Sequence, residues 1–491
     1  MNCHLLAKRS LSSKHTTSRI AAGSVHVIRG GRTRFSRRSA LVAIAAATLS
    51  GCRNEVDSPS ESAESTSSVP LRIGIYDPLA SSTGDVSEAE AIGESLSRAW
   101  SLASEQPLEI VALDVPTEAF DAKYDSDQVS DLFEQQAIGV DILVLPQTLL
   151  GTCAKFGCTA SLSDQVLKSF EDDFGKLYPA VRNGLGIFGS KAIGVAGGAK
   201  AFAFLSSDPE AICQDWNAYH DWVVQNEGLA AEPLAEGWAA TSFLHRCAST
   251  LERNWLFDRK TVKPLLDTED YHGVLRQMLE TASRYAGDQP LDPAAIWKAL
   301  RSGRLRGGIG YEVSTVENEI ASETTEPLDI AVSDSPAATP PSQIWFPSQT
   351  MIMALSSGCR QTDASKRLIG WMSGGEQVES FYRGSESFSP TRKASSVAGS
   401  QSSNRLTSNY MRWLDGRLQA VQVRTPLTIP GANLYRAVLD EEVRACLAGE
   451  KEPGIALRDA SERWDSITES IGRENQVVAW KRAQGFGGGL Y

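Results

Sequence analysis

The sequence predicts an α/β fold built on an open, mainly parallel sheet. Two alternating apolar runs, Leu71 to Asp77 and Leu108 to Leu113, have the period of two that is typical of strands, and Ala89 to Leu102 between them has helical spacing. A short helix is expected around Val129 to Gln136. The next run, Asp141 to Leu145, is almost continuously apolar, as in a strand that is buried on both faces of a parallel sheet. This alternation places ligand-facing positions at the carboxyl ends of the strands.

The rest of the chain continues the α/β pattern. Residues 323–347 are rich in Pro, Ser, Thr and acidic residues and indicate a surface loop. Residues 191–205 predict a strand that passes a Gly-Gly pair and continues as a second strand. Further strands are expected at 306–311 and 350–355, and helices at 215–225, 294–303, 363–372, 434–447 and 457–471.

Composition limits the function classes. The chain has 491 residues, of which 42% are hydrophobic and 22% are charged, as in an ordinary globular protein. The first 51 residues hold nine Lys or Arg and no acidic residue, so the remainder has 39 basic and 60 acidic side chains, a net charge of −21. Because phosphate binding needs a concentrated positive surface, this balance argues against a nucleic-acid partner.

The N-terminus predicts export. A basic stretch that ends in Arg37-Arg38 is followed by an apolar run from Ala40 to Leu49, which together are typical of a signal peptide over residues 1–51. The sequence Leu49-Ser50-Gly51-Cys52 resembles a bacterial lipobox, in which the Cys52 thiol would carry the lipid. The arginine pair resembles a twin-arginine signal, and a general secretion signal is the alternative. Residues 52–69 are polar and predict a disordered tether.

The sequence contains only weak patterns for a metal site or for disulfide bonds. Only His220, His245 and His272 follow the signal peptide, at no metal-ligand spacing, so no metal or cofactor is expected. Cys153 and Cys158 could close a short loop, and buried free thiols are the alternative for the six remaining cysteines.

One glycine motif matches a dinucleotide fingerprint in letters only. Residues 184–189 read Gly-x-Gly-x-x-Gly, but a strand is expected after them where the fingerprint needs a helix, so we interpret them as a glycine-rich turn. There is no nucleophile elbow and no Walker loop. A glycosidase stays an alternative because its two carboxylates need be neighbours only in space.

Six longer segments of the chain occur in an order that can be compared with known families. They are DILVLPQTLLGTCAKFGCTASLSD at 141–164, SKAIGVAGGAKAFAFLSSDP at 190–209, DWNAYHDWV at 215–223, LRSGRLRGGIGYE at 300–312, residues 351–393, and IPGANLYRAVLDEEVRACLAGEKEPGIALRDASERWDSI at 429–467. In this order they resemble the extracellular solute-binding proteins of carbohydrate ABC importers (family 1), which include the maltodextrin-binding proteins.

The resemblance implies a type II periplasmic-binding-protein fold. Its two lobes, each a central mainly parallel sheet flanked by helices, would enclose a ligand cleft, and the crossings between them would form the hinge. The implied boundaries are 70–196 with 346–395 for the first lobe and 197–345 with 396–491 for the second.

The resemblance also implies ligand-binding residues. Each aromatic one has a core residue as its alternative, since Trp and Tyr are often buried with one polar contact. Lys200 lies where maltodextrin relatives have an acid, which disfavours maltodextrin itself. The implied set is Trp238, Tyr311 and Tyr435 as stacking aromatics, Asp77 and Gln147 as polar residues at strand ends, Lys200, and Trp345 beside the return crossing.

The expected function is capture of a small solute, a carbohydrate in the first instance, by a monomeric lipoprotein on the periplasmic side of the cell membrane. Its partners would be that ligand, the permease subunits of an ABC importer, and the membrane through the lipid. The protein would not be an enzyme. Two alternatives remain: a sensor or scavenging lipoprotein of the same fold, and an exported glycan hydrolase.

Replacing Cys52 tests the predicted anchor. Cys52→Ser removes the thiol that would accept the lipid, so we expect the exported protein to be released from membranes. Membrane fractionation with mass spectrometry of the N-terminal peptide measures this. Retention of an unlipidated Cys52→Ser protein at the membrane would contradict the anchor.

Overall fold

The computed structural model describes one compact unit within residues 64–491. The signal peptide, Cys52 and Asp77 lie outside the described residues. The described residues are 69–76, 88–104, 106–113, 126–252, 256–287, 289–313, 329–339, 343–374, 388–393, 408–421 and 423–484.

The first sheet has six strands in the order β2-β1-β3-β13-β4, with β7 also paired to β13. β1 is parallel to β2 and β3, whereas β13 is antiparallel to β3, β4 and β7. The strands are β1 (Leu71–Tyr76), β2 (Leu108–Leu113), β3 (Ile142–Pro146), β4 (Thr159–Ala160), β7 (Gly194–Ala196) and β13 (Met351–Ser356).

Strand β3 is apolar throughout because both of its faces are covered. Ile142 and Val144 belong to a buried cluster with Trp100 of helix α1 (Glu88–Ala103). The alternate residues Leu143 and Leu145 belong to a second cluster with Phe133 of helix α2 (Ser126–Ile138). Since successive side chains of a strand point to opposite faces, neither face leaves room for a polar residue.

The second sheet has the order β11-β8-β10-β9. β8 is antiparallel to β10 and β11, and only β10 and β9 are parallel. The second sheet is therefore mixed, with one parallel pair and two antiparallel pairs. Its strands are β8 (Ala203–Ser206), β9 (Ala230–Ala231), β10 (Gly307–Gly310) and β11 (Ala331–Asp334).

The chain crosses from the first sheet to the second at residues 197–202, between β7 and β8. Side chains from distant segments bind the backbone of this crossing. The Ser389 hydroxyl accepts a hydrogen bond from the Ala199 N–H at 2.7 Å. The Tyr410 hydroxyl accepts from the Ala201 N–H at 3.1 Å and donates to the Ala201 carbonyl at 2.9 Å. The backbone groups of Ala199 and Ala201 are therefore hydrogen-bonded without sheet pairing.

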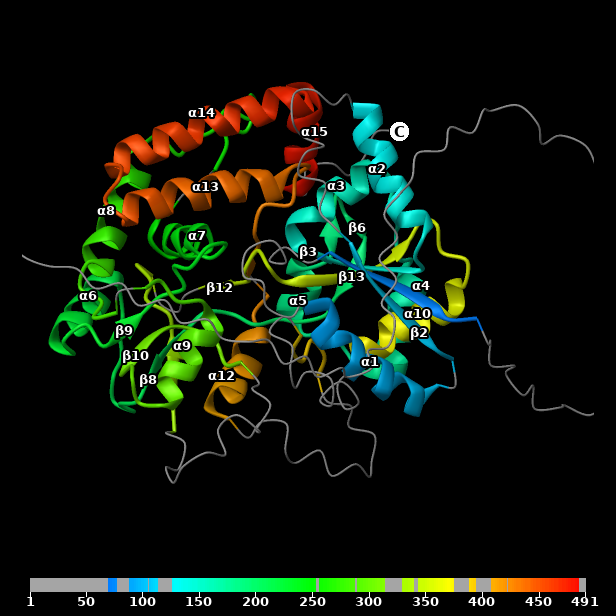
Figure 1. Ribbon diagram of the computed structural model, residues 1–491, viewed down its shortest axis with the longest axis horizontal. Helices are drawn as coiled ribbons and strands as arrows, with labels where there is room; N and C mark the ends of the chain where they lie inside the picture. The colour runs from blue at the N-terminus through cyan, green and yellow to red at the C-terminus, as the bar shows by residue number, and fades with distance from the viewer. Residues whose placement is uncertain are drawn as a thin grey trace, which may run out of the picture. The chain divides into compact units, whose positions relative to one another are not determined.

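Helices α13 and α14 lie side by side over α7 and α8 (Figure 1). Ten consecutive residues of α7, Ala239 to Ala248, are buried, so this helix lies inside the molecule. Phe257 stacks on Trp464 of α14, with ring centroids 5.1 Å apart, and meets Trp480 of α15 edge to face at 5.5 Å. The four helices are α7 (Ala239–Thr250), α8 (Glu269–Ala282), α13 (Ala432–Leu447) and α14 (Pro453–Ile471), and α15 (Arg473–Ala483) follows them.

The remaining elements are short. The strand pairs β5–β6 and β12–β14 form separate two-stranded sheets. The helices are η2 (Gln147–Leu149), α3 (Leu150–Lys155), α4 (Asp164–Phe174), α5 (Pro179–Gly184), α6 (Trp216–Gln225), α9 (Pro293–Arg301), α10 (Thr362–Met372) and α12 (Asn409–Leu418). The strands are β5 (Ile187–Phe188), β6 (Lys191–Ala192), β12 (Ile344–Trp345) and β14 (Val423–Arg424).

Two local expectations can be compared with these elements. The glycine motif at 184–189 is a turn only in part. Gly184 ends α5 and Ile187 and Phe188 form β5, while Gly189 and Ser190, with positive φ angles of 58° and 65°, turn the chain into the antiparallel strand β6. The surface loop expected over 323–347 is wrong in part, because β11 and β12 lie within it. These strands of four and two residues are too short to show a periodic pattern.

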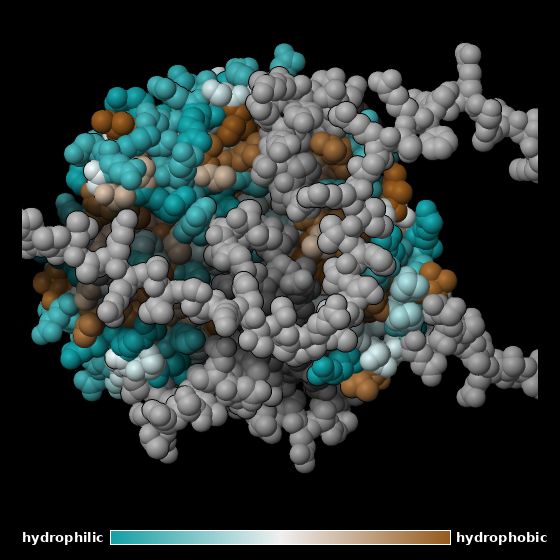
Figure 2. Space-filling model, viewed as in Figure 1, coloured by the Kyte–Doolittle hydropathy of each residue, from teal (hydrophilic) through white to brown (hydrophobic). Residues whose placement is uncertain are grey.

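The visible face over α13 and α14 is mostly hydrophilic, with hydrophobic residues in small patches (Figure 2). Exposed apolar side chains such as Ile455 and Val478 are scattered singly, as is normal for a protein surface. Among the described helices, none combines the length and apolar character needed to cross a membrane.

A glycine pair tests the packing between α3 and the segment before α13. A Cβ atom on Gly151 would lie 1.8 Å from the carbonyl oxygen of Thr428, whereas one on Gly416 of α12 would meet nothing within 4 Å. Gly151→Ala should lower the free energy of unfolding by about 1–3 kcal/mol or more, because the clash is with backbone. Gly416→Ala should raise it by about 0.5–1 kcal/mol through helix propensity.

Urea denaturation of both variants measures the two changes. Equal effects of the two substitutions would contradict the close approach at Gly151.

Candidate functional site

Five aromatic rings meet where the crossing enters the second sheet. Phe202, the last residue of the crossing, has its ring centroid 6.3 Å from Trp238, 5.9 Å from Tyr311 and 6.1 Å from Trp345. His245 of α7 completes the group, with its ring 5.3 Å from Phe202 and 5.6 Å from Trp345. We call these five residues the aromatic cluster. Three of them, Trp238, Tyr311 and Trp345, are among the residues implied by the sequence.

Each member of the cluster comes from a different position in the fold. Trp238 caps the N-terminus of α7, Tyr311 directly follows β10, and Trp345 ends β12. Their side chains are only 4–6% exposed. The rings therefore present their faces and edges mainly to one another in this structure, in the offset and edge-to-face arrangements that aromatic rings prefer.

Lys200 lies at the edge of the aromatic cluster. Its Nζ atom is 5.2 Å from the centroid of the Tyr311 ring, within the range of a cation–π interaction. The adjacent Glu312 is partly buried, and desolvation raises the pKa of its carboxyl group although the Ser408 hydroxyl and Lys200 oppose the shift. Lys200 thus lies beside Tyr311, another of the residues that the resemblance implies.

A polar network adjoins Trp238. The chain returns from the second sheet to the first through residues 346–350, between β12 and β13, which we call the return crossing. Within it, Gln349 donates from Nε2 to the carbonyl oxygen of Gly237 at 2.6 Å and to Thr241 Oγ1 at 3.2 Å. Arg436 of α13 donates to the same Gly237 carbonyl at 2.8 Å. The Asp440 carboxylate accepts the N–H of Gly237 at 2.9 Å. This network joins the return crossing to the N-terminus of α7 and to α13.

His245 is a neutral member of the cluster. It is 4% exposed, and its Nε2 atom lies 3.1 Å from the Ser335 hydroxyl. Burial, with the adjacent positive charge of Arg246, lowers the pKa of His245 to about 3. His245, Phe202 and Gln349 could not be singled out from the sequence, because single residues in apolar or loop segments carry no motif.

Gln147 lies apart from the aromatic cluster, at the start of η2. It is 1% exposed, and its Oε1 atom accepts the N–H of Gly186 at 3.2 Å. Its own N–H donates to the carbonyl oxygen of Thr350 at 2.8 Å. Gln147 therefore fixes the glycine turn and the end of the return crossing to one another.

Tyr435 lies among the α13, α14 and α15 helices and not with the aromatic cluster. It is fully buried, its hydroxyl lies 2.9 Å from Thr468 Oγ1, and its ring meets Phe257 and Trp464 edge to face. Desolvation raises the pKa of its hydroxyl to about 12. This environment is that of a core residue, the alternative that the sequence left open. Asp77 lies outside the described residues.

The buried carboxylates of the described residues all have partners. Asp141 accepts the N–H groups of Arg72 and Arg360, both at 3.0 Å. Glu232 pairs with Arg246, and Asp440 binds the N-terminus of α7. Glu442 accepts from Lys451 and Arg463.

The described cysteines, Cys153, Cys158, Cys213, Cys247, Cys359 and Cys446, are free thiols. Cys153 and Cys158 are both fully buried, and the Cys158 N–H donates to the Cys153 carbonyl at 3.0 Å. Burial and the neighbouring Cys158 thiol raise the pKa of Cys153. No group of three or more His, Cys, Asp or Glu placed to hold a metal ion occurs in the described part of the chain.

The fold is similar to that of two solved structures. One is an ABC transporter solute-binding protein from Agrobacterium radiobacter K84 in complex with ribitol, with 15% sequence identity, a TM-score of 0.62, and coverage of 82% of this chain and 99% of that chain. The other is the GacH receptor of Streptomyces glaucescens GLA.O, solved unliganded and with acarbose, with 15% identity, a TM-score of 0.55 and the same coverage.

No protein-family model matches the chain, and no curated protein matches it. The structural likeness confirms the predicted α/β fold of periplasmic binding proteins.

The buried imidazole predicts a pH dependence of stability. Because the pKa of His245 is about 3 in the folded state and about 6.5 when exposed, the unfolded chain takes up the proton first as the pH falls. The stabilisation from burying neutral His245 is complete above pH 6.5 and is lost as the pH falls toward 3. The free energy of unfolding should therefore fall by about 2 kcal/mol between pH 7 and pH 5.

Urea denaturation at both pH values, in the native protein and in His245→Gln, isolates this term because all other groups cancel in the difference. Identical pH slopes in the two proteins would contradict a buried neutral His245.

Proposed function

We propose that this chain is an extracytoplasmic solute-binding protein that captures a small carbohydrate and delivers it to an ABC importer. The observation that carries the proposal is the aromatic cluster at the junction of the two sheets. It combines Phe202 of the outgoing crossing with Trp345 beside the return crossing. A ligand held there would touch both paths by which the chain passes between the sheets.

The crossings supply a hinge in this proposal. The Gly197 N–H, at the start of the outgoing crossing, donates to the Met351 carbonyl at the start of β13, at 2.9 Å. The two crossings thus run next to one another, where a small change of backbone angles reorients one sheet against the other. A ligand that contacts both sides favours the closed state by its difference in affinity for the two states.

The chemistry of the site favours a polyhydroxylated ligand. Aromatic faces stack on the C–H surfaces of a sugar ring, and planar amide and guanidinium groups bind its hydroxyls. The aromatic cluster provides the faces. Gln349, Arg436 and Lys200 provide planar or cationic polar groups near it. Ligand entry would separate rings that now contact one another, so binding and hinge motion are one event in this proposal.

The predicted lipid on Cys52 and the polar tether behind it complete the proposal. They would hold the binding protein at the membrane surface, within reach of the permease subunits of the importer. The two solved structures named above are described as a transporter solute-binding protein and a receptor, which supports a binding role over a hydrolytic one.

A matched pair of lysines tests the site. Lys200 Nζ lies 5.2 Å from the Tyr311 ring in the cluster, and Lys155 Nζ lies 5.1 Å from the Phe156 ring outside it. Once a thermal-shift screen against sugars, polyols, amino acids and organic acids has found a ligand, Lys200→Met should weaken its binding by about 3- to 30-fold. Lys155→Met should leave the affinity unchanged.

Isothermal titration calorimetry measures the affinities, and chromatography of the recovered ligand shows whether it is intact. Equal affinities of the two variants would place the ligand elsewhere. Consumption of the ligand would favour the hydrolase. Binding of a sugar whose uptake is unchanged in cells that lack this chain would favour the sensor or scavenger.

A further inference from the structure

A cavity lies apart from the aromatic cluster, at the side of α13. Its volume is about 670 Å³, and it lies between β9, the segment 282–291 and α13. None of its lining residues belongs to the aromatic cluster. The volume falls inside the range of about 300–1,000 Å³ that is usual for small-molecule sites.

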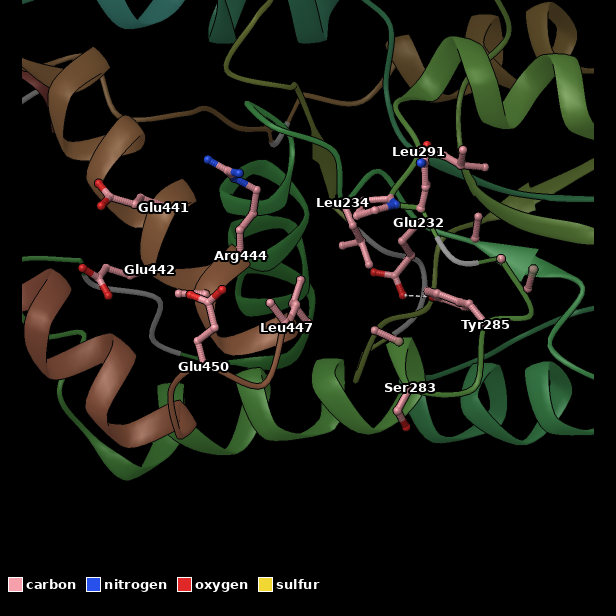
Figure 3. Close-up of a pocket in the computed structure, with 18 of the residues that line it drawn as sticks. Glu232, Leu234, Ser283, Tyr285, Leu291, Glu441, Glu442, Arg444, Leu447 and Glu450 are labelled. Carbon is pink, nitrogen blue, oxygen red and sulfur yellow. Dashed lines mark hydrogen bonds between the residues drawn. The ribbon is translucent and has the colours of Figure 1, made fainter. Parts of the chain in front are cut away.

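Leucine and alanine side chains form much of the wall of this cavity, and charged residues complete it. Leu234 and Leu291 lie on one side, and Leu447 of α13 lies on the other (Figure 3). Small alanine side chains of β9 and α13 line the space between them, which leaves room for a ring-sized body. Arg444 of α13 and Glu450, which follows α13, lie toward the opposite side from Glu232 (Figure 3).

One end of the cavity is polar and buried. The Glu232 carboxylate, 2% exposed, accepts a hydrogen bond from the Tyr285 hydroxyl at 2.7 Å (Figure 3). It also pairs with Arg246, whose Nε donates at 3.0 Å and whose Nη2 donates to the other carboxylate oxygen. Burial and the Glu232 charge raise the pKa of Tyr285, so its hydroxyl stays protonated. Because Arg246 neutralises Glu232, this end of the cavity demands no net charge from a ligand.

The hydrogen-bonding capacity of this end is not filled by the described residues. A carboxylate accepts about four hydrogen bonds, and the described residues supply three to Glu232. The fourth acceptor position suits a neutral O–H donor. Nη1 of Arg246 is also buried without an acceptor among the described residues. A small-molecule site typically combines a few fixed polar groups with an apolar lining. This cavity has both: the Glu232 carboxylate with one acceptor position open, and leucine and alanine side chains around it.

We propose that this cavity binds a neutral ring compound that carries a hydroxyl group. The ring lies between Leu234, Leu291 and Leu447, and its hydroxyl donates to Glu232 beside Tyr285. This site is separate from the proposed carbohydrate site and does not depend on it. A cation would meet a carboxylate that is already neutralised, and a hydrocarbon would leave the acceptor empty.

The test uses 2-naphthol as the probe and 2-methoxynaphthalene as its partner without a donor. Equilibrium dialysis of the purified full chain should show one saturable 2-naphthol site, with the methoxy compound bound at least about 10-fold more weakly, since a hydrogen bond to a charged group contributes about 1.5–3 kcal/mol. Equal binding of both compounds, or no saturable binding, would overturn the proposal.

A filling variant locates the probe. Ala448 lines the cavity and is exposed, so Ala448→Trp can fill the space without entering the core. It should weaken 2-naphthol binding at least 10-fold. The control Ile455→Trp, at a 46% exposed position of α14 outside the cavity, should bind as the native chain does.

Lys200→Met distinguishes the two sites. Undiminished 2-naphthol binding in Ala448→Trp would overturn the proposal, and loss of binding in Lys200→Met alone would also place the probe at the aromatic cluster. If Ala448→Trp does not fold, Tyr285→Phe gives the same decision through the selectivity between the two naphthalenes. That ratio should change when the hydroxyl beside Glu232 is removed.

Discussion

The return of β13 to the first sheet constrains the whole chain. β13 pairs with β3, β4 and β7, so a strand at residues 351–356 completes a sheet begun at residue 71. Everything between the two crossings must therefore leave this sheet and come back at a fixed register. Because the cost of closing a long loop grows only slowly with its length, a complete second sheet and helices α7 and α8 fit within that loop. The Asp141 carboxylate reinforces the closure by binding backbone N–H groups at residues 72 and 360.

Much of the first sheet could be predicted because its strands have regular apolar patterns. β1, β2, β3 and β13 all lie where those patterns indicate. The second sheet could be predicted less well, since β9 and β11 are short and Gly-Gly-Ile-Gly in β10 has little side chain to form a pattern. Helix α7 has no apolar stripe because it is buried on all sides, and the amphipathic periodicity on which prediction depends is then absent.

The candidate site shows the same division. Trp238, Tyr311 and Trp345 were chosen from the resemblance, and the structure brings all three together. Tyr435, chosen in the same way, instead packs against Trp464 in the helical core. Sequence alone cannot separate these cases, since a buried Tyr with a satisfied hydroxyl and a ligand-stacking Tyr have the same local sequence. Phe202, His245 and Gln349 have partners more than 30 residues away, and such partners become visible only when the fold is known.

Helix α7 connects the aromatic cluster with the polar end of the cavity at Glu232. His245 faces the aromatic cluster, and the next residue, Arg246, pairs with Glu232 and lies 4.0 Å from the ring of Trp216. The Tyr410 hydroxyl has a comparable dual task, because it binds both the N–H and the carbonyl of Ala201. A single oxygen atom thus satisfies two backbone groups at the place where the chain changes sheets. A single substitution of Tyr410 would have to supply both a donor and an acceptor at this position. Related sequences are therefore expected to replace Tyr410 only together with the residues around it.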